Sequence, residues 1–157
     1  MKIFLAIDGS ACSNAAVAKV SQRPWPSGSE VQLVTVVPPL DPGLLRGTSP
    51  TVFDEVVKQQ LMDASKRLNE AAATVRQNTS GLSVKTTLLE GRPKEVIVDE
   101  AHRWGADLIV VGSHGYGAVR RLFLGSVSLA VATNARCSVE IVRCPEEPEV
   151  EKPGANS

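Results

Sequence analysis

The sequence predicts an α/β fold, a doubly wound parallel sheet of five strands with helices on both faces. Short apolar runs alternate along the chain with longer segments whose apolar residues recur at three- and four-residue steps, which is typical of βαβ units. The first run, Lys2–Ile7, is apolar almost throughout, as expected for a strand covered on both faces. A chain of 157 residues is long enough to bury such a core as one domain.

The first elements have clear boundaries. After the strand Lys2–Ile7, Ser10 is a suitable N-cap for a helix over Ala11–Gln22. This helix must end before Pro24, because the residue before a proline disfavours the helical conformation. The β-branched segment Val31–Val37 predicts the second strand, which two prolines terminate.

The longest element is an amphipathic helix. Residues 40–50 contain Pro, Gly and Ser without periodicity and therefore predict a loop. From Phe53 onward, apolar residues recur at helical spacing over about 26 residues. Thr51, with Asp54 three positions on, is the expected start of this helix.

The remaining elements continue the alternation. Pro93 suits the first position of a helix, and Gly105 suits the position just after its end. The other predicted elements are strands at Leu82–Leu89, Leu108–Val111 and Val139–Arg143 and a helix at Ser126–Asn134. Residues 1–144 thus form the predicted domain, and residues 145–157 form an acidic, proline-rich tail that we expect to be disordered.

Charge and composition exclude several function classes. Lys plus Arg and Asp plus Glu both number 17, so no net positive charge would hold the chain to nucleic acid or to an anionic membrane. The N-terminal apolar run is too short for a signal segment or a membrane span, so we expect a cytoplasmic protein. These features favour a small ligand or a protein partner.

Three cysteines lack the spacing of a metal site. Cys12, Cys137 and Cys144 are odd in number and include no CxxC or Cys/His ligand pattern. The sequence therefore predicts three reduced thiols.

A glycine-rich segment carries the functional signal. Gly112 ends the fourth strand, Gly115 and Gly117 follow closely, and Gly125-Ser126 opens the next helix. Phosphate groups bind where glycines let them approach backbone N–H groups and where a helix N-terminus supplies partial positive charge. The Ser126 hydroxyl is suited to cap the helix or to bond a phosphate oxygen. The spacing matches neither a P-loop nor a dinucleotide fingerprint, so glycines alone leave turn formation open as an alternative.

The pattern Gly112-x2-Gly115-x9-Gly125-Ser126 resembles the nucleotide-binding signature of the universal stress protein family. The resemblance extends from Ile3 to Val142 and includes Ala-Ile-Asp8-Gly-Ser, Leu-Val-Thr-Val36-Val and Ala-Asp107-Leu-Ile-Val-Val-Gly112-Ser-His-Gly115. It implies strand order 3-2-1-4-5, a homodimer and binding of ATP or a related adenine nucleotide (ADP, AMP or cyclic AMP).

The resemblance also implies roles for single residues. Asp8 would contact ribose or a phosphate-bound Mg²⁺, with turn capping as the alternative, and the Val36 main chain would hold adenine, with core packing as the alternative. Ala6 stands in the adenine wall where many members have proline or valine. The phosphates and ribose would contact Gly112, Gly115, Gly125 and Ser126, with a further N–H from Val127.

Three basic side chains near the glycines have open roles. His114 can donate to a phosphate or simply face solvent, and Arg120 and Arg121 can neutralise phosphate charge or remain solvated. Beyond Asp8 the sequence offers no obvious base, so we expect nucleotide binding, with slow residual hydrolysis at most.

The favoured function is a dimeric, nucleotide-dependent stress sensor. In strand order 3-2-1-4-5 the segment Val139–Arg143 is an edge strand, which predicts dimerisation through it. One alternative is a dimeric adaptor that binds no nucleotide. Another is a receiver-type phosphotransfer domain, although Asp8 alone follows the first strand and Glu90-Gly91 follows the third.

Overall fold

The computed structural model describes residues 1–41, 43, 47, 49–115 and 124–144. Within these residues nine elements alternate, and the five strands form one parallel sheet in the order β3-β2-β1-β4-β5, as predicted. The predicted tail, 145–157, lies outside the described residues. The elements are β1 (Lys2–Ala6), α1 (Ala11–Gln22), β2 (Glu30–Val37), α2 (Pro50–Asn78), β3 (Ser83–Glu90), α3 (Pro93–Trp104), β4 (Leu108–Gly112), α4 (Ser126–Asn134) and β5 (Ser138–Val142).

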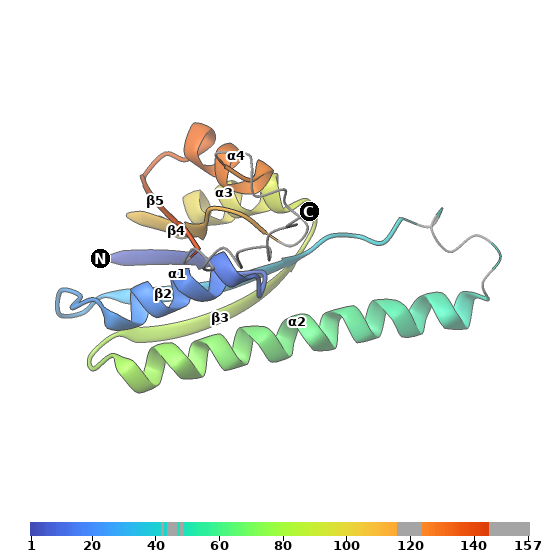
Figure 1. Ribbon diagram of the computed structural model, residues 1–157, viewed down its shortest axis with the longest axis horizontal. Coiled ribbons are helices and arrows are strands. Elements are labelled where there is room, and N and C mark those ends of the chain that lie inside the picture. Colours follow the sequence, from blue (N-terminus) through green and yellow to red (C-terminus); the bar gives the residue numbers. More distant parts are fainter. Residues whose placement is uncertain (42, 44–46, 48, 116–123, 145–157) are drawn as a thin grey trace, which may run out of the picture.

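Two apolar layers enclose the sheet. In β1, Ile3 and Leu5 pack with α1 and α2 on one face, whereas Phe4 and Ala6 pack with α3 and α4 on the other. Figure 1 shows the two pairs of helices on opposite sides of the sheet. Ile3, Phe4 and Leu5 are fully buried, which confirms that the central strand is covered on both faces.

The longest helix, α2, starts earlier than predicted. Ser49 is its N-cap and accepts a hydrogen bond from the Val52 N–H, and Pro50 occupies the first turn. Proline suits the first turn of a helix, because the N–H that it lacks would be unpaired there and its fixed φ is helical. Thr51 therefore lies inside the helix and does not start it. The buried residues of α2 begin only at Ala64, and the first half of the helix extends beyond the sheet (Figure 1).

The prediction of three reduced thiols is wrong for two of them. Cys12 and Cys144 form a disulfide, with Cα atoms 4.3 Å apart and a sequence separation of 132, whereas Cys137 is free. Local spacing carries no information on this pair, because the packing of α1 beside β4 and β5 creates the proximity.

The sheet order separates Glu90 from Asp8. β3 is an edge strand that pairs with β2, so β2 lies between the strand that ends at Glu90 and the strand that precedes Asp8. A receiver-type domain instead places its third strand beside the first. The structure therefore does not support the phosphotransfer alternative. Among the described residues, no helix is long and apolar enough to cross a membrane.

Candidate functional site

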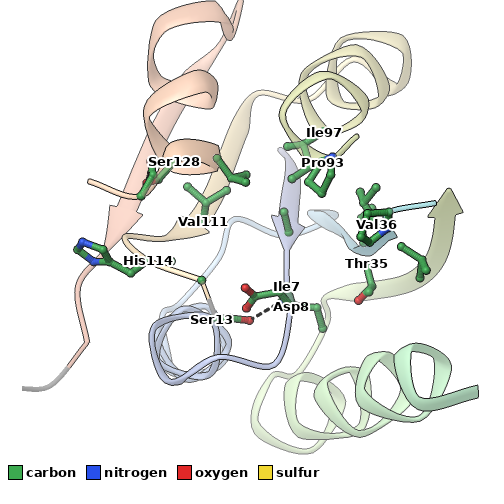
Figure 2. A pocket seen from close by; sticks show the side chains of 18 of the residues that line it. Ile7, Asp8, Ser13, Thr35, Val36, Pro93, Ile97, Val111, His114 and Ser128 are labelled. Carbon is green, nitrogen blue, oxygen red and sulfur yellow. Dashed lines mark hydrogen bonds between the residues drawn. The ribbon is translucent and has the colours of Figure 1, made fainter. Parts of the chain in front are cut away.

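A cavity of about 540 Å³ opens at the carboxyl ends of β1, β2 and β4. The chain runs from β1 through β2 to β3 on one side of β1 and then crosses back to β4 on the other side, so the strand order reverses here. Such a switch point is the usual ligand site of an open α/β sheet. Figure 2 shows side chains from these strands and from the starts of α3 and α4 around the opening. The lining residues are Ala6, Ile7, Asp8, Ser13, Val34, Thr35, Val36, Val37, Pro38, Gln60, Arg67, Pro93, Ile97, Val111, Gly112, His114, Gly115, Gly125, Ser126, Val127 and Ser128.

Three glycines form one wall, and each is in close contact with its surroundings. A Cβ at Gly112 would lie 2.7 Å from backbone atoms of Cys12 and Ser13. A Cβ at Gly115 would lie 2.6 Å from Oδ2 of Asp8, and one at Gly125 would lie 3.1 Å from the Ser113 carbonyl oxygen. None of the three has a positive φ. These glycines are therefore required for close approach rather than for an unusual backbone conformation.

Ser113 joins the two ends of this glycine loop, which we define as residues 112–115 and 124–125. Its N–H donates to the Val142 carbonyl over 2.7 Å, and its own carbonyl accepts from the Gly125 N–H at 2.7 Å and from the Ser128 hydroxyl at 2.8 Å. Both ends of the loop are thus fixed to each other and to β5. The intervening Gly117, Arg120 and Arg121 lie outside the described residues.

The N-terminus of α4 supplies backbone donors to the cavity. Gly125 is the N-cap, and the first intrahelical bond runs from the Leu129 N–H to the Gly125 carbonyl. The N–H groups of Ser126 and Val127 precede this bond, so helical geometry leaves them available to an anion. Ser126 does not cap the helix. Its exposed hydroxyl has no hydrogen bond to another described residue, which leaves phosphate bonding as its candidate role.

The Asp8 carboxylate caps a turn and also lines the cavity. Its Oδ1 accepts from the Ser10 N–H at 2.9 Å, which holds the turn, whereas its Oδ2 faces Gly115. The Ser13 hydroxyl accepts from the Asp8 N–H at 3.1 Å, drawn dashed in Figure 2. The carboxylate is therefore fixed at the edge of the glycine loop while it remains exposed to the cavity.

The opposite wall is apolar. Ala6 and Val111, neighbours in the sheet, form its base, and Val36, Pro93 and Ile97 surround them (Figure 2). Val36 is half-buried, is the next-to-last residue of β2 and lines the opening. A wall of this kind suits a flat, largely apolar group such as a nucleobase.

Sequence reasoning missed the polar side chains that α2 contributes. Arg67 and Gln60 lie seven residues apart, on the helix face that borders the buried Ala64 and Leu68. Among the described lining residues, Arg67 is the only lysine or arginine. Its buried Nε and the buried hydroxyl of Thr35 have no hydrogen-bond partner among the described residues. In the sequence, the available signal was a pair of polar residues seven positions apart, next to the apolar stripe of this helix.

His114 lies at the rim of the cavity. Its ring Nδ1 is 3.1 Å from the Ser113 hydroxyl, its carbonyl accepts from the Ser10 hydroxyl at 3.2 Å, and Figure 2 shows the ring directed away from Asp8. The structure thus gives His114 a role in joining the loop to the start of α1.

Metal-binding capacity at the site is small. Within the part of the chain that the structure describes, no three His, Cys, Asp or Glu side chains gather as a metal site, and Asp8 is the only carboxylate that lines the cavity. A metal would therefore need most of its ligands from a bound molecule and from water.

Comparison with known proteins identifies relatives across nearly the whole chain. The model of the Universal stress protein family matches residues 1–143. A universal stress protein of Thermus aquaticus is 37% identical over 141 residues, which are 90% of this chain and 97% of the relative. The structure of the universal stress protein UspA from Lactobacillus plantarum superposes with a TM-score of 0.74 at 25% identity and covers 91% of this chain and 97% of that one.

Two less similar solved structures contain adenine nucleotides. A universal stress protein in complex with cAMP has a TM-score of 0.64 at 22% identity, over 92% of this chain and 98% of that one. An Arabidopsis thaliana member with AMP bound has a TM-score of 0.64 at 19% identity, over 92% of each chain. These two similarities establish a shared fold, and their ligands are properties of those proteins.

Proposed function

The chain belongs to the universal stress protein family, and we propose that it is a nucleotide-dependent sensor that binds ATP or a related adenine nucleotide in the cavity at the ends of β1, β2 and β4. In this proposal the phosphates lie along Gly112, Gly115, Gly125 and Ser126, and adenine lies against Val36. Homologous structures with AMP and cAMP support this choice of ligand.

The contact between Gly115 and Asp8 is the observation that carries the proposal. A backbone that approaches a carboxylate this closely, beside the donors of α4, forms a cradle that any side chain at residue 115 would fill. The cradle provides N–H donors for phosphate and an acceptor for a ribose hydroxyl. Ala6 and Ile97, with Val127 at the start of α4, complete an enclosed apolar side for the base.

The site also fits a nucleotide-bound Mg²⁺. Magnesium usually takes one or two protein carboxylates, several waters and the phosphates of the nucleotide, and Asp8 supplies one carboxylate. When bound, the ion would offset phosphate charge, while Asp8 would orient it through Oδ2 and keep Oδ1 on the Ser10 N–H.

The donor set favours holding a nucleotide over cleaving it. Hydrolysis needs a group that orients water and a cation near the γ-phosphate. Asp8 is committed to the turn and, in this proposal, to ribose or metal, and the only lysine or arginine among the described lining residues, Arg67, comes from α2 and not from the glycine loop. We therefore expect slow residual hydrolysis at most.

Homodimerisation through β5 is a second part of the proposal. Among the described strands, β5 pairs only with β4, so its other edge presents backbone groups that no described strand pairs. An isologous pairing of two copies would satisfy them. Light scattering at micromolar concentration should return twice the 16.7 kDa of one chain. A mass of 16.7 kDa would contradict the dimer but not nucleotide binding. We also propose that the protein acts in the cytoplasm.

Calorimetric titration tests nucleotide binding directly. ATP, AMP and cyclic AMP, each with and without Mg²⁺, are titrated into the native chain and into Gly115→Val. We expect micromolar binding of at least one nucleotide and loss of it in Gly115→Val. Gly43→Ala is the control, because its Cβ would also approach a carboxylate, that of Asp41 at 3.1 Å, and neither residue lines the cavity. If no nucleotide binds below millimolar concentration, the chain is instead a nucleotide-free adaptor.

A further inference from the structure

The disulfide between Cys12 and Cys144 lies directly against the glycine loop. Cys12 is in the first turn of α1 and is 1% exposed, whereas Cys144 follows β5 and is partly exposed. A Cβ at Gly112 would lie 2.9 Å from the Cys12 Cβ, so the two residues are in close contact. The Ser113 hydroxyl donates to the Cys12 sulfur over 3.5 Å. The disulfide therefore contacts the start of the loop that faces the cavity.

The same two cysteines flank the bonds that order both sides of the proposed phosphate cradle. Cys144 comes two residues after Val142, whose carbonyl accepts from Ser113. Cys12 precedes Ser13, whose hydroxyl accepts from the N–H groups of Asp8 and Gly9 at 3.1 and 3.4 Å. These bonds connect the disulfide to the glycine loop through Ser113 and to Asp8 through Ser13. A change in the distance between the two sulfur atoms would therefore displace both the loop and Asp8.

We propose that Cys12 and Cys144 are a reversible redox pair whose disulfide orders the glycine loop and thereby strengthens nucleotide binding. The effect on affinity rests on the nucleotide binding proposed above, whereas the effect on the loop does not. In the reduced chain the two sulfur atoms must move apart to van der Waals separation, which is longer than a covalent S–S bond. Gly112 leaves no space beside Cys12, so the movement falls on Ser113 and on the end of β5.

Hydrogen peroxide is the oxidant in the proposed reaction. The Cys144 thiolate, which is the more accessible, attacks one peroxide oxygen, breaks the O–O bond and becomes a sulfenic acid. The hydroxide that leaves takes up the proton released by the thiol and becomes water. The Cys12 thiolate then attacks the sulfenic sulfur, and the S–OH oxygen leaves as a second water. Two thiols and one hydrogen peroxide thus give one disulfide and two waters. A dithiol reverses the reaction by thiol–disulfide exchange.

The third cysteine provides an internal control. Burial and then the nearby Asp107 carboxylate raise the pKa of the Cys137 thiol, so it stays protonated and unreactive at neutral pH. Cys137 is also absent from the cavity lining. In the cytoplasm proposed for this chain, disulfides are usually transient or redox-sensing, which favours a regulatory pair over a structural staple.

Alkylation under denaturing conditions, read by intact mass, verifies each redox form before any binding measurement. The peroxide-treated chain should label one thiol and the dithiothreitol-treated chain three. Titration with ATP and with AMP should then show affinity at least about fivefold higher for the oxidised chain. Cys144→Ser and Cys12→Ser should bind at the reduced value under both conditions, and Cys137→Ser should respond as the native chain does.

Hydrogen exchange separates a failure of this proposal from a failure of nucleotide binding. The Ser113 and Gly125 amides should exchange more slowly in the oxidised chain even without nucleotide. If no nucleotide binds either form, slower exchange still supports the redox pair, and equal exchange overturns it. Equal affinity in two verified redox forms overturns it as well, as does failure of peroxide to form the disulfide or a response that persists in Cys144→Ser.

Discussion

The two walls of the cavity are built in opposite ways. On the glycine-loop side, backbone atoms and the Asp8 carboxylate lie so close to the glycines that a methyl group would be in conflict at Gly112 and Gly115 and tightly packed at Gly125. On the other side, the apolar side chains of Val36, Pro93 and Ile97 line the cavity. The difference indicates that the loop side recognises charge through fixed backbone donors, whereas the apolar side recognises shape. Substitutions should therefore have large effects on the first wall and small effects on the second.

Gly112→Ala should have the largest effect. Its Cβ would lie 2.7 Å from two backbone atoms of α1, which cannot move independently of the helix. We expect a loss of about 1–3 kcal/mol of unfolding free energy, as for other overpacked sites, together with loss of nucleotide binding. Chemical denaturation and calorimetry measure the two effects. Gly43→Ala should change neither, and native stability in Gly112→Ala would show that the loop is loosely packed against α1.

Asp8→Asn should have the next largest effect. The amide retains an oxygen for the Ser10 N–H but loses the negative charge, so the turn persists while the contact with ribose or Mg²⁺ weakens. Affinity for Mg-ATP should fall roughly tenfold, the equivalent of one hydrogen bond to a charged group. Circular dichroism checks that the fold is retained. An unchanged affinity in the presence of Mg²⁺ would restrict Asp8 to its role in the turn.

Arg67→Met tests the one described cation on the opposite side. Methionine keeps the length and apolar stem of the side chain and removes its charge. Because Arg67 reaches the cavity from α2 and is half-buried, we expect affinity for ATP to fall by up to about fivefold, with the difference shrinking as salt concentration rises. Titrations of both proteins with ATP at low and high ionic strength measure how the loss of affinity depends on salt concentration. A salt-independent loss would point to packing rather than charge.

Val36→Thr should have the smallest effect. The two side chains have nearly the same shape, so the hydroxyl only lowers the apolar character of the wall, and we expect about a threefold loss of affinity for all adenine nucleotides. Val98→Thr is the matched control, since Val98 packs against the same apolar cluster but is not part of the cavity lining. A loss as large as that of Asp8→Asn would reverse the ranking of the two walls.

Features set by neighbouring residues were predictable from the sequence. The α1 bounds, the Ser10 cap, and Pro93 and Gly105 at the ends of α3 follow from local propensity and are confirmed. Alternation predicted a parallel sheet, and the family resemblance alone implied its strand order, and both are confirmed. The glycine loop was found because its residues are close in sequence.

Features that arise from tertiary packing were not predictable. The disulfide joins residues whose proximity exists only once β5 has added to the sheet. The heptad spacing of Gln60 and Arg67 marks a polar edge of α2, but it does not distinguish Arg67 from a solvated arginine, because its place in the cavity depends on how α2 crosses the sheet. The early start of α2 was missed for a different reason, because a capping pattern at Thr51 competed with Ser49 and Pro50.

The central position of β1 has a consequence for how the chain folds during synthesis. One edge of β1 pairs with β2, which follows it closely, but the other edge pairs with Leu108–Val111, more than two-thirds of the way along the chain. Phe4 is fully buried in the folded protein, where it packs in one cluster with Ile109 and Val111 of β4. Until the ribosome has released β4, Phe4 cannot make these contacts. Such late pairing slows folding and exposes strand edges. The first residues to be made are thus among the last to be protected, and a nascent chain stalled before β4 is the form most dependent on chaperones.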